Sequence, residues 1–587
     1  MKLPPDSALT GNPDVVRLST SLFDRRPDDC RDFAAVKARP HVWPAVYEKR
    51  RYAPWESFPL GVVMRALDDV EFDGADADEA VEKAVAANRT PLHPSAAAWV
   101  RHAVHTYLEA GEDMDAALAA EGVTLRPERL PRVVQGGRSP MEMRVLTAWG
   151  RWYATADGSV VEFRRMRMRM PYGRPDAVST QAVAYVAAAG RRVTDPGDLY
   201  TLVPVPVLRE DTLPARVRVV EVGLTTGLDK VLLDMTSEEV QQGYRTAVRP
   251  AAAALLAGGP RVPGQDCADC KTRASCGLIV PTPGLLGLGD RGTHRRTWSI
   301  TTARRYQVCP AQSHLRDLRV PGEGSDSVAT QRGLDVHRWL EVAHWRGRPC
   351  TPADLPEPGA ADCGIADTLM DRQRYHKVRP YLLQHIRCCP LAADGEITDV
   401  QPERRIATYD ATADVVVLAD PDLLRRVNGL LVYREQKTSA APRGITADNA
   451  LHMVPQLALA VCLIAAGVFG EATGLVELEQ LTPESAEVIT LDAADPAVVA
   501  AARSVVNELV RDWHHDVEFH ATPGPWCAFC PVARWCGDAF RGVPSTSVDL
   551  MVDLVTGEIL TNPHQPDTRM EAIAEAVAEP ELDEPPF

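Results

Sequence analysis

The sequence predicts an α/β protein of two tandem halves, each closed by a set of cysteines. A cysteine triplet occurs twice with the same spacing, as "CADCKTRASC" at residues 267–276 and "CAFCPVARWC" at residues 527–536. Residues 403–439 read as strands around a turn, and the apolar residues of "GLDVHRWLEVAHW" have helical spacing. Strands and helices in one half, with the cysteine pattern repeated in the other, indicate a duplicated α/β domain.

Composition and charge narrow the class of protein. The chain has 587 residues, 45% of them hydrophobic and 25% charged, which suits two to four folded domains. No run of eighteen apolar residues and no apolar leader is visible in the sequence, so we expect a cytoplasmic protein without a membrane span. The net charge of -16 argues against nonspecific coating of nucleic acid. Residues 549–587 carry ten acidic residues and one arginine, or -9, which leaves -7 for the rest and allows a local basic groove.

Each cysteine triplet needs a fourth ligand, and one earlier cysteine in each half can supply it. Cys309 stands in "SITTARRYQVCPAQSHL", 218 positions before Cys527 (527 minus 309), and Cys30 stands in the similar "STSLFDRRPDDCRDF", 237 positions before Cys267 (267 minus 30). Four thiolates fit either zinc or an iron-sulfur cluster, and a lone distant cysteine with a closing C-x2-C-x5-C favours a 4Fe-4S cluster. The predicted cluster ligands are Cys309, Cys527, Cys530 and Cys536 in the second half and, for a second cluster matched through the context of Cys30, Cys30, Cys267, Cys270 and Cys276.

Composition shifts give the domain boundaries. Residues 280–297 are rich in glycine and proline, which predicts a linker between a first domain at 1–279 and a second at 298–545. The acidic, Pro- and Glu-rich residues 546–587 predict a disordered tail. The other five cysteines are expected to be mostly buried apolar residues.

The second half contains a candidate catalytic hairpin. Its first strand is predicted to run through Asp414, with "ADPD" and "VNG" forming the turn and "LLVYREQKTS" the second strand. Glu435 and Lys437 would share one strand face, with Asp414 on the neighbouring strand. Two carboxylates suit Mg²⁺ or Mn²⁺, the lysine suits charge stabilisation on a phosphorus centre, and His337 on the preceding helix could add a ligand. The alternative is an ordinary surface charge pair.

In order, these pieces resemble the RecB-type branch of the PD-(D/E)XK nuclease superfamily, in particular its iron-sulfur members of the AddB and CRISPR-associated exonuclease type. The matching pieces span residues 299–537 and are "CPAQSHL", "GLDVHRWLE", "ATADVVV", "EQKTS", "VPQLALAV" and "CAFCPVARWC". The resemblance implies two tandem restriction-endonuclease-like domains, each a mixed sheet flanked by helices and closed by a four-cysteine staple. It implies metal ligation by His337, Asp414 and Glu435, catalysis by Lys437, and positioning of DNA or the active site by Gln456. The usual glycine before the motif aspartate is absent, and Ala460 replaces the usual tyrosine.

The first half resembles a degenerate copy of the same domain. Met64 is predicted to stand in the place of the histidine, and the strand "VRVVEVGLTTG" offers Glu221 with Gly223 in the place of the lysine. Asp176 is the candidate partner carboxylate. Without histidine and lysine, this half is expected not to catalyse cleavage.

An alternating segment in the first half, "FRRMRMRMPYGR", would place Arg165, Arg167 and Arg169 on one face of a strand. That face could be solvated or could bind phosphates, and the sequence leaves both readings open.

The predicted function is a metal-dependent DNA nuclease of DNA repair or of defence against foreign DNA. One alternative is an inactive subunit that binds DNA ends, or acts as a scaffold, within a nuclease-helicase complex. A second is a zinc-stapled interaction protein. The sequence contains no Walker motif, so any helicase activity would come from a partner.

Overall fold

The protein is described by a computed structural model. It describes residues 9–26, 28–44, 59–88, 91–139, 142–209, 213–323, 328–357, 370, 372–541, 550–553 and 558–561. Within these ranges, no helix combines the length and the apolar character needed to cross a membrane. The predicted tail at 546–587 lies outside the described residues except for the paired strands β21 (Leu550–Asp553) and β22 (Glu558–Thr561).

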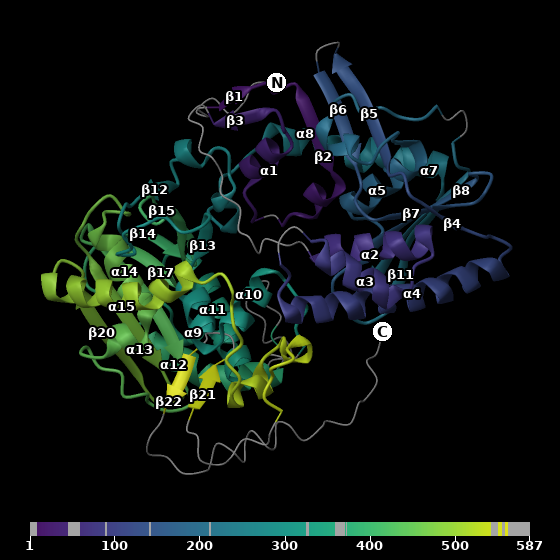
Figure 1. Ribbon diagram of the computed structural model, residues 1–587. Coiled ribbons are helices and arrows are strands. Elements are labelled where there is room, and N and C mark those ends of the chain that lie inside the picture. The colour runs from purple at the N-terminus through teal and green to yellow at the C-terminus, as the bar shows by residue number, and fades with distance from the viewer. Residues whose placement is uncertain are drawn as a thin grey trace.

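Each half is built on one five-stranded mixed sheet. Figure 1 shows the first half in purple to teal and the second in teal to yellow. The first sheet has the order β11-β10-β8-β7-β4 and the second the order β14-β17-β18-β19-β20. Their bounds are β4 (Arg126–Glu128), β7 (Arg151–Ala154), β8 (Val160–Arg167), β10 (Arg216–Gly223), β11 (Asp229–Thr236), β14 (Ile397–Pro402), β17 (Leu423–Val427), β18 (Leu430–Thr438), β19 (Leu475–Leu481) and β20 (Ala486–Asp492). The mixed sheets with flanking helices confirm the predicted α/β fold class.

The two sheets share one topology. In the first, β8 pairs antiparallel with β7 and parallel with β10; in the second, β18 pairs antiparallel with β17 and parallel with β19. The outer strands are antiparallel to their neighbours in both sheets. In the first sheet these pairs are β4 with β7 and β10 with β11, and in the second they are β14 with β17 and β19 with β20. Strand β8 is therefore the counterpart of β18, and β10 is the counterpart of β19.

The hairpin of the second half forms later in the chain than the sequence predicted. Asn428 and Gly429 both have positive φ, 51° and 85°, which is the two-residue turn that joins twisted antiparallel strands. The hairpin is thus β17 and β18. Asp414, also at positive φ, instead ends the turn between β15 (Ile406–Asp410) and β16 (Val415–Ala419), which belong to another sheet.

That other sheet includes both ends of the segment predicted as a linker, residues 280–297. Strand β12 (Ile279–Pro281) pairs with β15, and β13 (Arg296–Trp298) pairs with β16, both in parallel. The four-stranded sheet β12-β15-β16-β13 therefore takes its two edge strands from the segment between the predicted domains. The domain limits at 279 and 298 stay predictions.

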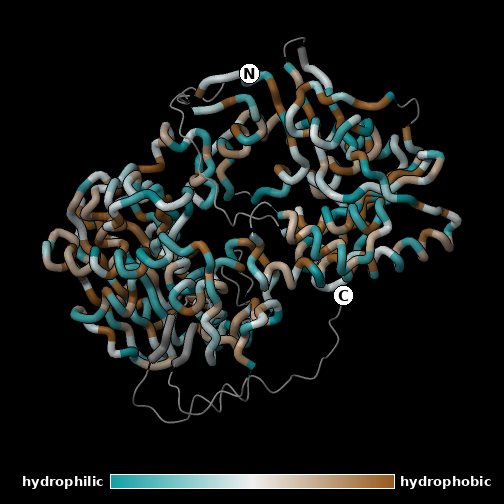
Figure 2. The backbone as a smooth tube through the Cα atoms, in the orientation of Figure 1, coloured by the Kyte–Doolittle hydropathy of each residue, from teal (hydrophilic) through white to brown (hydrophobic). Residues whose placement is uncertain are grey.

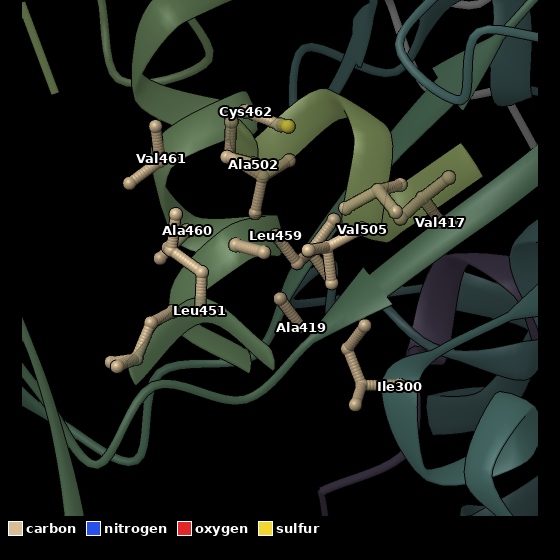
Figure 3. Packing of buried hydrophobic residues seen from close by; sticks show 14 of the residues in the cluster. Ile300, Val417, Ala419, Leu451, Leu459, Ala460, Val461, Cys462, Ala502 and Val505 are labelled. Carbon is tan, nitrogen blue, oxygen red and sulfur yellow. The ribbon is translucent and has the colours of Figure 1, made fainter. Parts of the chain in front are cut away.

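One face of the second sheet is covered by α14 (Pro455–Ala465) and α15 (Pro496–His515), and the hydrophobic core lies between them and the strands. Figure 3 shows Leu459 and Ala460 of α14 beside Val505 of α15, with Val417 of β16 close by. Nearly every residue of α14 is buried, which accounts for its continuous apolar sequence. Figure 2 shows hydrophobic segments in both halves of the chain. The opposite face is covered by α11 (Val328–Trp345) and α12 (Arg372–Arg387).

The cysteine segments make contacts between the halves. Cys267 and Cys276 pack against a cluster that includes Val416 and Leu418 of the second half. Conversely, Val532 and Trp535 join the core of the first-half helices α2 (Pro59–Asp73) and α4 (Pro94–Ala120). Each cysteine segment is therefore covered by the half to which it does not belong.

Candidate active site

Glu435 and Lys437 lie on one face of β18, as the alternation of a strand requires. Lys437 Nζ is 2.9 Å from Glu435 Oε2, and the Tyr433 hydroxyl donates to Glu435 Oε1 at 3.3 Å. Glu435 is buried, whereas Lys437 is partly exposed. The predicted Glu-x-Lys pair is thus brought together at the edge of the core.

Asp422 completes this group, because it directly precedes β17. Leu423 pairs with Arg434, so Asp422 lies opposite Glu435 across the hairpin, and its Oδ2 accepts the backbone N–H of Gln436. His337 of α11 reaches the same point: its Nδ1 is 2.8 Å from Asp422 Oδ1 and 3.7 Å from Glu403 Oε1. Ligand atoms of His337, Glu403 and Asp422 all lie within 4.8 Å of one another.

The electrostatics of the group are those of crowded, buried carboxylates. Burial raises the pKa of Glu435 to about 7; the Lys437 ammonium opposes the rise, and Asp422 adds to it. Burial alone would lower the pKa of His337, but Asp422 and Glu403 outweigh it and raise that pKa to about 10. Such a concentration of acidic oxygens favours a bound cation.

Asp414 does not join this group, which corrects its assignment as a metal ligand. Its Oδ1 accepts from Arg295 Nε at 2.6 Å, just before β13, and from the hydroxyl of Tyr409 in β15 at 2.7 Å. The sequence signal for Asp422 was nonetheless present. "ADPD" directly precedes a strand that is followed by Asn-Gly, and that spacing places Asp422 beside the Glu-x-Lys strand.

Gln456, the remaining predicted site residue, is the second residue of α14 and is half-buried. Its Oε1 is buried and has no hydrogen-bond partner within the described part of the chain. A buried acceptor without a partner is costly, which distinguishes Gln456 from most other polar residues of the core.

The second-half cysteines meet as predicted. Cys309, Cys527, Cys530 and Cys536 line one cavity of about 380 Å³, including space open to solvent. Backbone N–H groups of Thr522 and Gly524 point at the sulfurs of Cys309 and Cys527 at 3.4 and 3.5 Å, and Gln312 Nε2 lies 3.4 Å from Cys530 Sγ. Donors aimed at sulfur suit ligating thiolates.

The first-half cysteines meet in the same way. Cys30, Cys267, Cys270 and Cys276 line a second cavity. The N–H groups of Phe33 and Gly264 lie 3.4 and 3.3 Å from the sulfurs of Cys30 and Cys267. The structure therefore places Cys30, chosen from its context alone, beside the triplet.

The first half lacks counterparts of Glu435 and Lys437 more completely than the sequence suggested. The β7–β8 hairpin of the first half corresponds to β17–β18 of the second. The first residue of β17, Leu423, pairs with Arg434, and the first residue of β7, Arg151, pairs with Arg164. The counterparts of Glu435 and Lys437 are therefore Arg165 and Arg167, and Gly150 stands where Asp422 does. Glu221, on β10, corresponds to Leu478 and not to Glu435, because it pairs with Arg165 as Leu478 pairs with Glu435.

Glu221 neutralises these arginines. It is fully buried and accepts from Arg165 Nη1 at 3.3 Å, from Arg167 Nε at 2.7 Å and from the backbone N–H of Gly173 at 2.7 Å. Arg165 and Arg167 thus form an ion-pair network with Glu221 inside the fold. These two side chains therefore form neither the solvated face nor the phosphate-binding face that the sequence left open. Arg169 is exposed.

The other first-half candidates lie outside this network. Asp176 is exposed and pairs with Arg174 at 3.6 Å. Met64 lies against Arg151 of β7, 3.9 Å from its Nη1.

Replacing Glu221 by glutamine should destabilise the protein without affecting the DNA cleavage predicted for the second half. The substitution removes the anion that offsets two arginines, so we expect the free energy of unfolding to fall by about 2 kcal/mol. Urea denaturation measures this loss, with Asp176→Asn as an exposed control expected to change little. A folded Glu221→Gln protein that no longer cleaves would contradict an inert first half.

A family profile matches the part of the chain that carries this group. The PD-(D/E)XK nuclease superfamily profile matches residues 297–537. No curated protein matches the sequence. Among solved structures, the crystal structure of SSO0001 is similar over 42% of this chain and 87% of its own, at 14% identity and a TM-score of 0.21. A "Putative exonuclease" from Eubacterium rectale is similar over 42% of this chain and 91% of its own, at 12% identity and a TM-score of 0.27. The profile match covers His337, the β17–β18 hairpin and the second cysteine set, and residues 297–537 are a domain of the PD-(D/E)XK nuclease superfamily.

Proposed function

We propose that the protein is a metal-dependent DNA nuclease that acts in DNA repair or in defence against foreign DNA. The observation that carries this proposal is the convergence of His337, Asp422, Glu435 and Lys437 at the end of one hairpin. These residues come from a helix, from one strand and from the position just before its partner strand. Because burying carboxylates together is costly, they are not expected to gather at a buried edge by chance.

The side chains fit a hard divalent cation. Asp422 and Glu435 offer carboxylate oxygens, and the neighbouring His337 and Glu403 offer a further nitrogen and oxygen. Mg²⁺ or Mn²⁺ bound there would polarise the scissile phosphate and lower the pKa of an attacking water. We propose that Lys437 orients that water and stabilises charge on the phosphorus, and that Gln456 positions the substrate.

Cleavage by the full chain tests this proposal. We expect anaerobically purified protein to cut end-labelled single- or double-stranded DNA with Mg²⁺ or Mn²⁺, and to stop when EDTA removes the metal. Lys437→Ala is the matched control for a contaminating nuclease.

The alternative of an inactive DNA-end-binding or scaffold subunit predicts a different result. DNA would then be bound but left uncut with every divalent metal, including in the presence of a helicase partner. The intact Glu435–Lys437 pair in the second half, beside its loss in the first, favours the active enzyme.

We further propose that the cysteine sets hold 4Fe-4S clusters. Sulfurs that share one zinc ion lie about 3.8 Å apart, because each is about 2.3 Å from the ion. In the described part of the chain, the groups whose ligand atoms lie within 4.8 Å of one another do not include either cysteine set. The wider spacing supports a cluster of several metal atoms over a single ion.

A further inference from the structure

We propose that the protein contains a structural zinc site, separate from the nuclease site and from both cysteine sets, formed by His344, Cys350, His385 and Cys389. These side chains come from α11, from the segment that follows it, from α12, and from the turn that follows α12. Their exposed fractions are 1, 3, 0 and 4%. Ligand atoms of all four lie within 4.8 Å of one another.

The distances within the group suit a tetrahedral ion. His344 Nε2 lies 3.2 Å from His385 Nε2, and Cys389 Sγ lies 3.3 Å from the backbone N–H of Cys350. Around one zinc, two nitrogens about 2.1 Å from the ion lie about 3.4 Å apart. Two imidazole nitrogens at this distance either share one proton in an N–H···N hydrogen bond or bind one cation together, and the two nearby thiols favour the cation.

The surrounding residues orient one of the histidines as a ligand. His385 Nδ1 is 2.6 Å from Glu479 Oε1, so Nδ1 donates to the carboxylate and Nε2 is left to bind metal. Glu479 is itself fixed by Gln436 Nε2 at 2.9 Å and Arg434 Nη1 at 3.2 Å. This carboxylate–histidine pairing is typical of protein zinc sites.

The donor set selects the metal and its role. Two thiolates with two imidazoles match zinc in preference to Mg²⁺ or Mn²⁺, which prefer oxygen ligands. Cys350 and Cys389 are both free thiols, so their sulfurs are available to a metal ion. Four protein ligands would fill the tetrahedral shell of the ion, so it would stabilise structure and would not catalyse.

The site lies behind the nuclease residues. Helix α11 carries His344 two turns after His337, and β18 carries Gln436, which reaches Glu479, between Glu435 and Lys437. Zinc would therefore join α11, α12 and, through Glu479, β19. It would hold the helix that presents His337 to Asp422.

Zinc content of the full chain, purified anaerobically, tests the proposal. Cys350→Ser and His385→Ala should each contain about one zinc per chain less than the wild type and the same iron. Cys462→Ala, which removes a buried thiol outside the group, should lose none. His344→Cys should keep zinc, since a Cys3His set also binds it. The test compares the zinc content of each variant with that of the wild type. Any zinc in the cysteine sets is the same in both, so the difference reports only the His344 group.

X-ray absorption at the zinc edge keeps the proposal testable if these variants fail to fold. Neither cysteine set supplies a nitrogen ligand, so the wild-type zinc should show nitrogen neighbours at about 2.1 Å with sulfur at about 2.3 Å. A sulfur-only shell, equal zinc in wild type and Cys350→Ser, or a Cys350–Cys389 disulfide in the anaerobic protein would each overturn it.

Discussion

Replacing Asp422 by asparagine should reduce the rate of DNA cleavage by about 10³-fold, whereas Asp414→Asn should leave it near the wild-type rate. Asparagine keeps the shape of Asp422 but removes the negative charge beside Glu435, which a hard cation requires. Asp414 ends a turn of the smaller sheet, where it accepts hydrogen bonds from Arg295 and Tyr409. Single-turnover cleavage at saturating Mg²⁺ measures both rates.

Two further measurements separate chemistry from binding. Mn²⁺ affinity should fall in Asp422→Asn, while DNA affinity should stay nearly unchanged in Lys437→Ala, whose loss affects mainly the transition state. If Asp414→Asn were the inactive variant and Asp422→Asn the active one, the site proposed on the β17–β18 hairpin would be refuted.

Replacing Cys530 by serine should remove one cluster and strongly destabilise the second half. The set joins Cys309 to Cys527, 218 positions apart (527 minus 309), so its loss removes a cross-link that would close a very long loop in the unfolded chain. A loss of about 4 kcal/mol would lower the melting temperature by about 10 °C. Iron, acid-labile sulfide and visible absorption of the anaerobic protein report the cluster, and thermal unfolding reports its contribution to stability.

Two variants serve as controls for this experiment. Cys276→Ser should remove the cluster of the first half and keep that of the second, and Cys462→Ala should retain the iron of the wild type. Wild-type protein that contains zinc in both sets and no iron would favour the zinc-stapled alternative.

The parts of the site that were predictable from sequence are those with short, fixed spacing. The cysteine triplets and Glu435-x-Lys437 depend on local geometry, because a strand alternates and a C-x2-C turn is compact. Asp422 was missed because "ATADVVV" also reads as a strand carrying an aspartate. Only the pairing of β17 with β18 distinguishes the two aspartates, and pairing depends on register rather than on composition.

Two further features could not be predicted from the sequence because they depend on pairing between strands that lie far apart in the chain. Residues 280–297 look like a linker because glycine and proline dominate, yet β12 and β13 find their partners more than a hundred residues later. Glu221 looked like the counterpart of Glu435 because both stand in apolar strands. The parallel partner of each strand, visible only in three dimensions, shows that β8 and not β10 corresponds to β18.

The cover that each half provides for the other's cysteines has a consequence during synthesis. The first cysteine set is complete in sequence at Cys276, but the second-half surface that packs against Cys267 and Cys276 begins at Ala407, 131 residues later (407 minus 276). At ribosomal rates of about 5–20 residues per second, this surface arrives about 7–26 s later. During that interval the nascent chain presents these thiols to solvent, which gives metal delivery a defined opportunity before the second half closes over them.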